Sequence, residues 1–130
     1  MISAIPIKTN TAPEPVGPYN QAIKAGNFLY CSGQIAINPE NNQLESLGDI
    51  RGETTRVLKN LSAVLKAGGA NLEDVIKTTI FLTDLNNFKI VNQIYSEFFK
   101  SEPTPARACV EVSSLPKGVL IEIDCVAYIH

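Results

Sequence analysis

The strongest structural signal in the chain lies between residues 50 and 65, where one set of residues recurs at helical spacing. The members of this stripe are Ile50, Thr54, Val57, Leu58, Leu61, Val64 and Leu65. Ser46 and Asp49 precede the stripe as candidate N-caps, and Gly68-Gly69 follows it as a stop signal. The pattern predicts an amphipathic helix with a single apolar stripe. Such a helix must lay that stripe on another layer of structure.

Strand patterns surround this helix. Alternating side chains predict a strand over Val75–Thr83, and a second helix follows it, capped by Asp84. The apolar face of the second helix holds Leu85, Phe88, Val91, Tyr95, Phe98 and Phe99. Further strands are expected over residues 3–8, 19–24, 28–32, 34–38, 106–112 and 119–129, with turns at 25–27 and 39–42. Residues 11–18 carry three prolines and a glycine, so we expect an ordered loop there.

The last predicted strand has two unlike faces. One side is apolar throughout and holds Val119, Ile121, Ile123, Cys125, Ala127 and Ile129. The other side mixes Leu120, Val126 and Tyr128 with two acids, Glu122 and Asp124. Two helices can cover only one face of a sheet, so the mixed face needs another cover. We predict a second copy of the chain there, because self-association is the commonest way to bury such a face.

Two charged residues stand in these apolar strands. Arg107 follows the proline-led segment Pro103-Thr104-Pro105, and Glu122 interrupts the last strand. Removing a charge from water costs on the order of several kcal/mol unless the charge is paired. The planar guanidinium of an arginine grips a carboxylate through two parallel hydrogen bonds. Arg107 therefore needs an anionic partner, either an internal acid such as Glu111 or a small acidic ligand.

The segment around Arg107 resembles the C-terminal signature of the RidA (YjgF) family. The matching residues are Pro105-Ala106-Arg107, Cys109 and Ile121-Glu122-Ile123. Three other stretches are similar to the same family, namely Gly17–Ala22, Cys31–Ile35, and Lys77–Leu82 with Asp84-Leu85. The resemblance spans nearly the whole chain. It implies a chorismate-mutase-like α+β subunit with a mixed β-sheet, two helices packed on one face, and a homotrimer with clefts between neighbours.

The resemblance also implies an activity. The family hydrolyses reactive enamines and imines, such as 2-aminoacrylate, 2-iminopropanoate and 2-iminobutanoate, to 2-keto acids and ammonium. The expected enzyme is thus a 2-iminobutanoate/2-iminopropanoate deaminase, a hydrolase acting on C=N bonds. Arg107 would hold the substrate carboxylate, and Glu122 would orient or activate water, because a desolvated carboxyl group can act as acid or base near neutral pH. The residues alone leave an ordinary ion pair as an equal reading of Glu122.

Five more residues become pocket candidates through the resemblance. Tyr19 can close over a small substrate or simply pack the proline-rich loop. Ser32 and Gly33 offer a hydroxyl and an unhindered backbone N–H, or only a strand-end bend. Asn92 either hydrogen-bonds a ligand or a neighbouring subunit, or it faces solvent. Cys109 is expected to be a small residue whose backbone amide faces the ligand, with a reactive thiol as the alternative.

Composition excludes several other classes. A net charge of −2, from eleven Lys plus Arg and thirteen Asp plus Glu, gives no basic stripe for nucleic acid. The single histidine, His130, cannot serve a catalytic triad, and no cluster has metal-ligand spacing, so we expect neither metal nor cofactor. Neither a targeting peptide nor a membrane-spanning run is evident. Cys31 and Cys125 are expected in the core, and the odd, dispersed cysteines fit a reducing, cytoplasmic location. A chain of 130 residues fits a single RidA-like domain over residues 1–130.

Two alternative functions remain open. The same arginine would serve a non-catalytic trimer that binds and senses small 2-keto acids, so the sequence cannot separate a sensor from a deaminase. A ribonuclease or translation inhibitor is the weaker alternative, because the acidic balance and the lack of a histidine pair oppose it.

Overall fold

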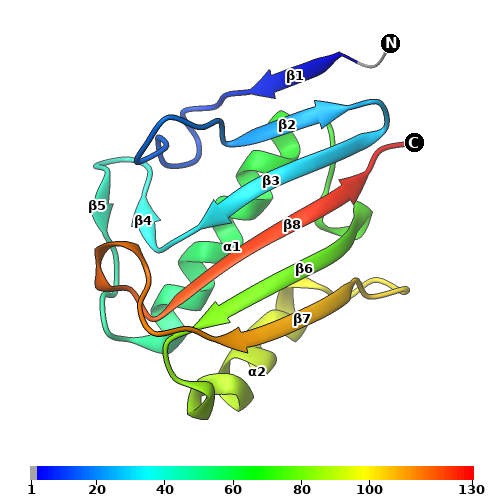
Figure 1. Ribbon diagram of the computed structural model, residues 1–130. Coiled ribbons are helices and arrows are strands. Elements are labelled where there is room, and N and C mark those ends of the chain that lie inside the picture. The colour runs from blue at the N-terminus through cyan, green and yellow to red at the C-terminus, as the bar shows by residue number, and fades with distance from the viewer. Residues whose placement is uncertain (1–2) are drawn as a thin grey trace.

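The computed structural model describes residues 3–130, in which both helices lie on the same face of a mixed sheet (Figure 1). In chain order the elements are β1 Ala4–Ile7, β2 Ala22–Ala25, β3 Phe28–Gln34, β4 Ile37–Asn38, β5 Gln43–Leu44, α1 Ile50–Ala67, β6 Val75–Leu82, α2 Phe88–Phe98, β7 Ala106–Glu111 and β8 Ile121–Tyr128. Short 3-10 turns at Leu72–Asp74, Leu85–Asn87 and Pro116–Gly118 precede β6, α2 and β8, respectively. No helix within residues 3–130 is both long enough and apolar enough to cross a membrane.

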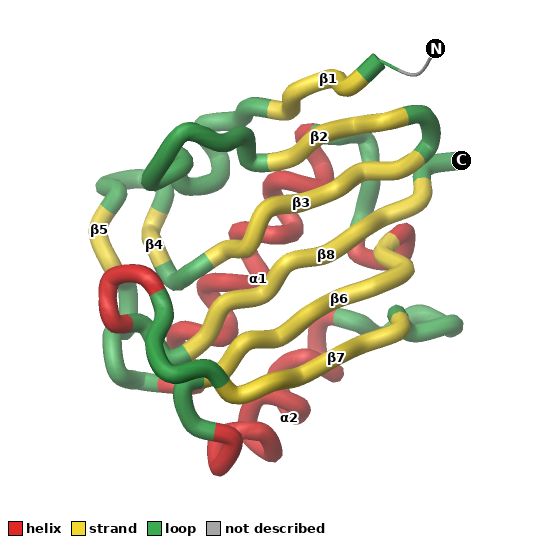
Figure 2. The backbone as a smooth tube through the Cα atoms, viewed as in Figure 1, coloured by secondary structure: helices red, strands yellow, loops and turns green. Residues whose placement is uncertain are grey.

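The main sheet has six strands in the order β1-β2-β3-β8-β6-β7. Neighbouring strands are antiparallel except for β6 and β7, which are parallel. Parallel neighbours require a crossover, and the segment containing α2 supplies it. The two-stranded pair β4–β5 lies at one end of the sheet (Figure 2). This order places β8 in the middle of the sheet and β7 at its edge, so Arg107 and Glu122 sit on an edge strand and a central strand.

Helix α1 begins and ends where the sequence pattern predicts. The Asp49 side chain accepts a hydrogen bond from the backbone N of Arg51 at 3.2 Å, and Gly68 forms the C-cap. Ser46, the other candidate cap, instead lies in the preceding loop with a φ of +59°. The apolar stripe is buried against the sheet, including Leu58, Leu61 and Leu65, each with 0% exposure.

The second helix begins later than predicted. Asp84 does cap the segment, accepting from the backbone N of Asn86 at 2.9 Å, but the turn that it caps is a 3-10 turn over Leu85–Asn87. Helix α2 proper starts at Phe88. Strand β2 likewise starts at Ala22 rather than at Tyr19, and the two-residue strand β5 was not predicted.

The two faces of the sheet differ as predicted. In β8 the residues at 121, 123, 125 and 127 are buried beneath the helices, and Cys125 lies opposite the buried Cys31 of β3. The other face exposes aromatic rings: Phe28, Tyr30 and Tyr128 are 39%, 51% and 36% exposed, respectively. Phe28 and Tyr128 contact each other with ring centroids 5.3 Å apart. A cluster of exposed rings on a sheet face is typical of an interaction surface.

Candidate functional site

The loop before β2 is held by one buried amide. Gln21 is 3% exposed; its side chain accepts from the backbone N of Thr9 at 2.7 Å and donates to the carbonyl oxygens of Thr9 at 3.0 Å and Pro13 at 2.8 Å. One amide thus satisfies the backbone of a proline-rich segment that forms no ladder of its own. Sequence reasoning did not single out Gln21, because a lone glutamine carries no spacing signal.

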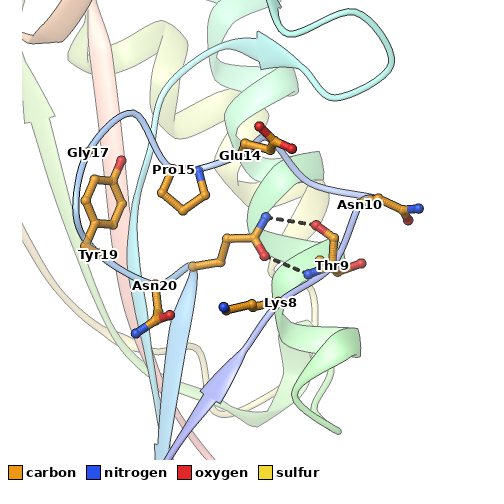
Figure 3. A pocket seen from close by; sticks show the side chains of 9 residues that line it. Lys8, Thr9, Asn10, Glu14, Pro15, Gly17, Tyr19 and Asn20 are labelled. Atoms are coloured by element: carbon orange, nitrogen blue, oxygen red, sulfur yellow. Dashed lines mark hydrogen bonds between the residues drawn. The ribbon is translucent and has the colours of Figure 1, made fainter.

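Tyr19 lies at the wall of the cavity beneath this loop (Figure 3). The cavity has a volume of about 780 Å³, and its walls include Lys8, Glu14 and Asn20. The Tyr19 side chain is 46% exposed, and its hydroxyl accepts from the backbone N of Val16 at 3.2 Å. The ring therefore packs on its own loop while its hydroxyl keeps the capacity to donate.

Ser32 joins β3 to the Tyr19 loop. Its backbone N donates to the carbonyl of Gln21 at 2.9 Å, and its hydroxyl donates to the carbonyl of Asn20 at 2.6 Å. The hydroxyl proton is thus used internally. The oxygen can still accept a hydrogen bond from a ligand or a water.

Gly33 and Glu122 are in direct contact. The register between β3 and β8 shifts between Cys31 and Gln34, and Gly33 lies in this irregular stretch. A Cβ atom added to Gly33 would overlap Oε2 of Glu122 and would lie 2.8 Å from its Cδ. The Glu122 side chain therefore occupies the space that any other residue at position 33 would fill. Gly33 and Tyr19 also line one small cavity of about 20 Å³. We call Tyr19, Ser32, Gly33 and Glu122 the central group.

The carboxyl group of Glu122 keeps its proton to a higher pH than an ordinary glutamate does. Burial raises its pKa, and the nearby Asp124 raises it further. Asp124 lies two residues along β8, on the same face. The pKa of Asp124 is also raised. Burial raises it by more than hydrogen bonding to Thr79 and the charge of Lys77 lower it. A partly buried acid beside a second acid is an arrangement suited to proton transfer near neutral pH.

Arg107 and Cys109 point toward α2. They lie opposite Thr78 and Ile80 in the parallel β6–β7 pair, and both of those residues are buried on the helix side. The guanidinium carbon of Arg107 lies 5.0 Å from the ring centroid of Tyr95 and 5.3 Å from that of Phe88. The sequence had indicated both aromatic residues only as the apolar face of a helix.

Asn92 belongs to the same region. It is half-buried in α2, four residues after Phe88 and three before Tyr95, so the three share one helix face. The structure thereby places Asn92 on the helix face that Arg107 packs against. We call Asn92, Arg107 and Cys109 the edge group.

Arg107 has no acidic partner among the described residues. The one ion pair present within residues 3–130 joins Arg56 to Glu45 at 3.9 Å. Glu111, the internal acid that the sequence offered as a partner, instead accepts from the backbone N of Leu85 at 2.9 Å. The internal pair with Glu111 is therefore wrong, and Arg107, an exposed residue, is available to an outside anion.

Cys109 lacks the setting of a nucleophile. Burial raises the pKa of its thiol, and the nearby Arg107 only partly opposes that shift. A thiol reacts as the thiolate, which a raised pKa disfavours. His130 packs edge-on against Tyr128 with ring centroids 5.4 Å apart, at the end of β8 rather than on the edge strand.

The two groups lie on opposite faces of the sheet. Arg107 faces the helices, whereas Glu122 stands between the helix-facing Ile121 and Ile123 and so projects from the other face. The layer of the sheet separates the two charged groups within one chain. The structure therefore gathers the predicted site residues into two separate groups rather than into one pocket.

Comparisons with known proteins identify similar chains. The family model described as Endoribonuclease L-PSP matches residues 9–129. A RutC family protein from Pyrococcus horikoshii is 53% identical over 122 residues, covering 94% of this chain and 95% of that protein. The human protein named 2-iminobutanoate/2-iminopropanoate deaminase is 46% identical over 121 residues, covering 93% and 87%, respectively. A solved structure of a Rid family protein from Yersinia pestis has a TM-score of 0.94 and 47% sequence identity, covering 98% of this chain and 100% of that one.

Proposed function

The chain belongs to the RidA (YjgF) family, and from this membership we propose that it hydrolyses the imines and enamines of small 2-keto acids to the keto acid and ammonium. The observation that carries the proposal is Arg107, an exposed cation with no described acidic partner. 2-Iminopropanoate and 2-iminobutanoate each place a carboxylate beside the reacting C=N group, and the enamine 2-aminoacrylate does so once it has tautomerised to 2-iminopropanoate. The name of the human relative supports this substrate class.

The proposed mechanism divides the work between the two charged residues. Arg107 binds the substrate carboxylate bidentately and fixes the C=N carbon in position. A water oxygen bonds to that carbon while the Glu122 carboxylate accepts the water proton and the C=N electron pair moves to nitrogen. Glu122 returns that proton to nitrogen, which completes a neutral carbinolamine. The hydroxyl proton then moves to nitrogen through Glu122, the oxygen electron pair forms the carbonyl as the C–N bond breaks, and the released ammonia takes up a solvent proton to become ammonium.

Two copies of the chain are needed to complete this site. Because Arg107 and Glu122 face opposite sides of one sheet, we propose that the central group of one copy meets the edge group of its neighbour in a homotrimer. The exposed rings of Phe28, Tyr30 and Tyr128 offer the apolar surface for such a contact. The pairing also accounts for the open donors of Arg107, which would face a cleft rather than bulk water.

Complementation of two inactive variants tests the shared site. Arg107→Ala and Glu122→Ala chains, co-expressed with different tags, are expected to regain about a quarter of wild-type activity per site, because random pairing unites an intact Arg107 with an intact Glu122 at about one contact in four. Each variant expressed alone should be inactive and should show the wild-type trimer mass by light scattering. A mixed sample that stays inactive, or a monomeric wild-type mass, would disprove the pairing.

The acid limb of the pH profile tests the role of Glu122. If its carboxylate is the base, kcat/KM rises with pH as Glu122 loses its proton. Asp124→Asn removes the neighbouring negative charge that raises the pKa of Glu122, so the acid limb should move to lower pH. Glu40→Gln, which removes one exposed acid from the β4–β5 turn, is the matched control and should leave the limb in place. A limb that stays put or moves to higher pH in Asp124→Asn would contradict the assignment.

The activity itself is tested in a coupled assay. A pyridoxal-phosphate-dependent threonine dehydratase releases the four-carbon enamine, and the protein should accelerate the appearance of 2-ketobutanoate above the uncatalysed rate. Binding of 2-ketobutanoate without any acceleration would instead select the sensor function. Both outcomes are measurable with the same purified protein.

The family description also names an endoribonuclease, but the residues of this chain give that activity little support. The net charge is −2, and the single histidine is the last residue, packed against Tyr128. Binding to a phosphate backbone relies on clustered Lys and Arg. We therefore propose no ribonuclease function.

A further inference from the structure

The side chain of Arg107 is held in place by aromatic rings. Its guanidinium carbon lies 5.0 Å from the centroid of Tyr95 and 5.3 Å from that of Phe88, both within the range of about 6 Å at which a cation is attracted to a ring face. Both rings come from α2, while Arg107 comes from β7. A free arginine side chain explores many rotamers, and ordering it on binding costs conformational entropy. Contacts made before a ligand arrives reduce that cost at the moment of binding.

The Tyr95 ring is itself fixed from two sides. Its hydroxyl and that of Thr78 share a hydrogen bond of 2.8 Å in the interior. Thr78 is the residue of β6 that lies opposite Arg107 in the sheet, and it is 0% exposed. The Tyr95 ring also packs against Phe99 with centroids 4.4 Å apart. Burial raises the pKa of Tyr95, so its phenol stays neutral and does not form an ion pair with the guanidinium.

From these contacts we propose that Phe88 and Tyr95 form an aromatic seat that orients Arg107 for a carboxylate ligand, with Thr78 locking the seat through the Tyr95 hydroxyl. The three are positioning residues that act through Arg107. The inference rests on the proposed function for the identity of the substrate, but the ordering of Arg107 does not depend on it.

An aromatic seat can orient Arg107 without occupying its N–H donors, whereas an acidic partner would occupy them. A carboxylate holds an arginine by occupying its N–H donors and by cancelling its charge. A ring contacts the π-face of the guanidinium and leaves the in-plane donors free. Glu111, the nearest candidate acid on β7, is kept away by its bond to the backbone of Leu85. The geometry thus gives an ordered cation whose donors and charge remain available to the ligand.

Steady-state kinetics of seat variants test this role. Tyr95→Leu and Phe88→Leu should each raise KM for the imine substrate roughly five- to thirtyfold while kcat stays within about twofold, because the lost contact orients the binding group rather than the reacting atoms. Tyr95→Phe keeps the ring and should restore most of the affinity. Thr78→Val should resemble Tyr95→Phe, since both remove only the hydroxyl bond. Phe98→Leu is the matched control, because Phe98 is a half-buried ring of the same helix that packs on the core.

A second measurement does not require turnover. The Nε–H group of Arg107 in the ligand-free protein should give NMR relaxation typical of an ordered side chain, and Tyr95→Leu should shift it to a mobile one. The affinity for 2-ketobutanoate, measured by titration, should also fall in Tyr95→Leu. If the wild type shows no imine hydrolysis but Arg107 loses order in Tyr95→Leu, the seat stands and the deaminase assignment fails. If hydrolysis is normal but KM and the relaxation of Arg107 are unchanged in both leucine variants, the seat is refuted.

Discussion

Arg107→Ala is expected to lower kcat/KM for 2-iminobutanoate by about a thousandfold, since removing one partner of a hydrogen-bonded charge pair costs about 2–5 kcal/mol. The loss should reflect the missing grip on the substrate carboxylate rather than a damaged fold. Arg107 is exposed on an edge strand and has no described ion pair to lose. Circular dichroism, the thermal midpoint and the oligomer mass should therefore match the wild type.

Two further variants define the cause of that loss. Arg107→Lys keeps the charge but loses the planar fork, so its kcat/KM should fall between those of the wild type and Arg107→Ala. Arg51→Ala removes an exposed arginine from α1, whose side chain donates to Gln93 at 3.4 Å, and should leave turnover unchanged. Wild-type kcat/KM in Arg107→Ala would remove the basis of the proposed function.

Gly33→Ala is expected to reduce activity by about a hundredfold or more while changing the free energy of unfolding by only about 1 kcal/mol. The added methyl would overlap Oε2 of Glu122, so the carboxyl group must move. That movement is easy for the fold, because the displaced atoms are the end of a flexible side chain. It is harmful to catalysis, because the proton acceptor leaves the position from which it can reach the water.

A double-mutant cycle isolates the Gly33–Glu122 contact. In a Glu122→Ala background, Gly33→Ala should cause no further loss of activity, because the group that it displaces is already absent. Glu122→Asp, which is shorter by one methylene, should partly relieve the clash in the stability measurement. Equal losses from Gly33→Ala in the presence and absence of Glu122 would show that the glycine acts through something other than this carboxyl group.

The sequence predicted the elements of this fold better than their arrangement. Helix α1, strand β6 and the two faces of β8 follow directly from periodic patterns and were found where expected. Periodicity reports which side of an element is buried, and that information is local. Element boundaries were less certain. The second helix begins with a 3-10 turn because Asp84 bonds the backbone N of Asn86, two residues on.

The pairing of strands could not be read from those patterns. Whether β7 lies parallel to β6 depends on the crossover through α2, which no local signal specifies. That pairing turns Arg107 toward the helices, and Glu122 faces away from them. The sequence could nominate both residues, because charges are unusual in apolar strands. Only the sheet order reveals that one chain separates them.

The roles of the buried polar residues also could not be predicted from the sequence. Glu53 is 0% exposed and accepts from the backbone N atoms of Gly48 and Leu120, each at 2.9 Å, so it ties the loop before α1 to the start of β8. In the sequence it is one more acid on a helix. Its role, like that of Gln21, depends on backbone groups brought near by the fold from distant parts of the chain.

The opposite orientation of Arg107 and Glu122 has a consequence for cells that make two versions of this chain. On the proposed arrangement, a subunit damaged in either half spoils a reaction centre that it shares with a healthy neighbour. A chain that lacks only Arg107 still lends its Glu122 to a wild-type neighbour, so it should leave imine clearance at the level set by the wild-type chains. A chain that lacks both residues would poison part of the normal product, and overexpressing Arg107→Ala/Glu122→Ala beside the wild type should depress clearance below that level.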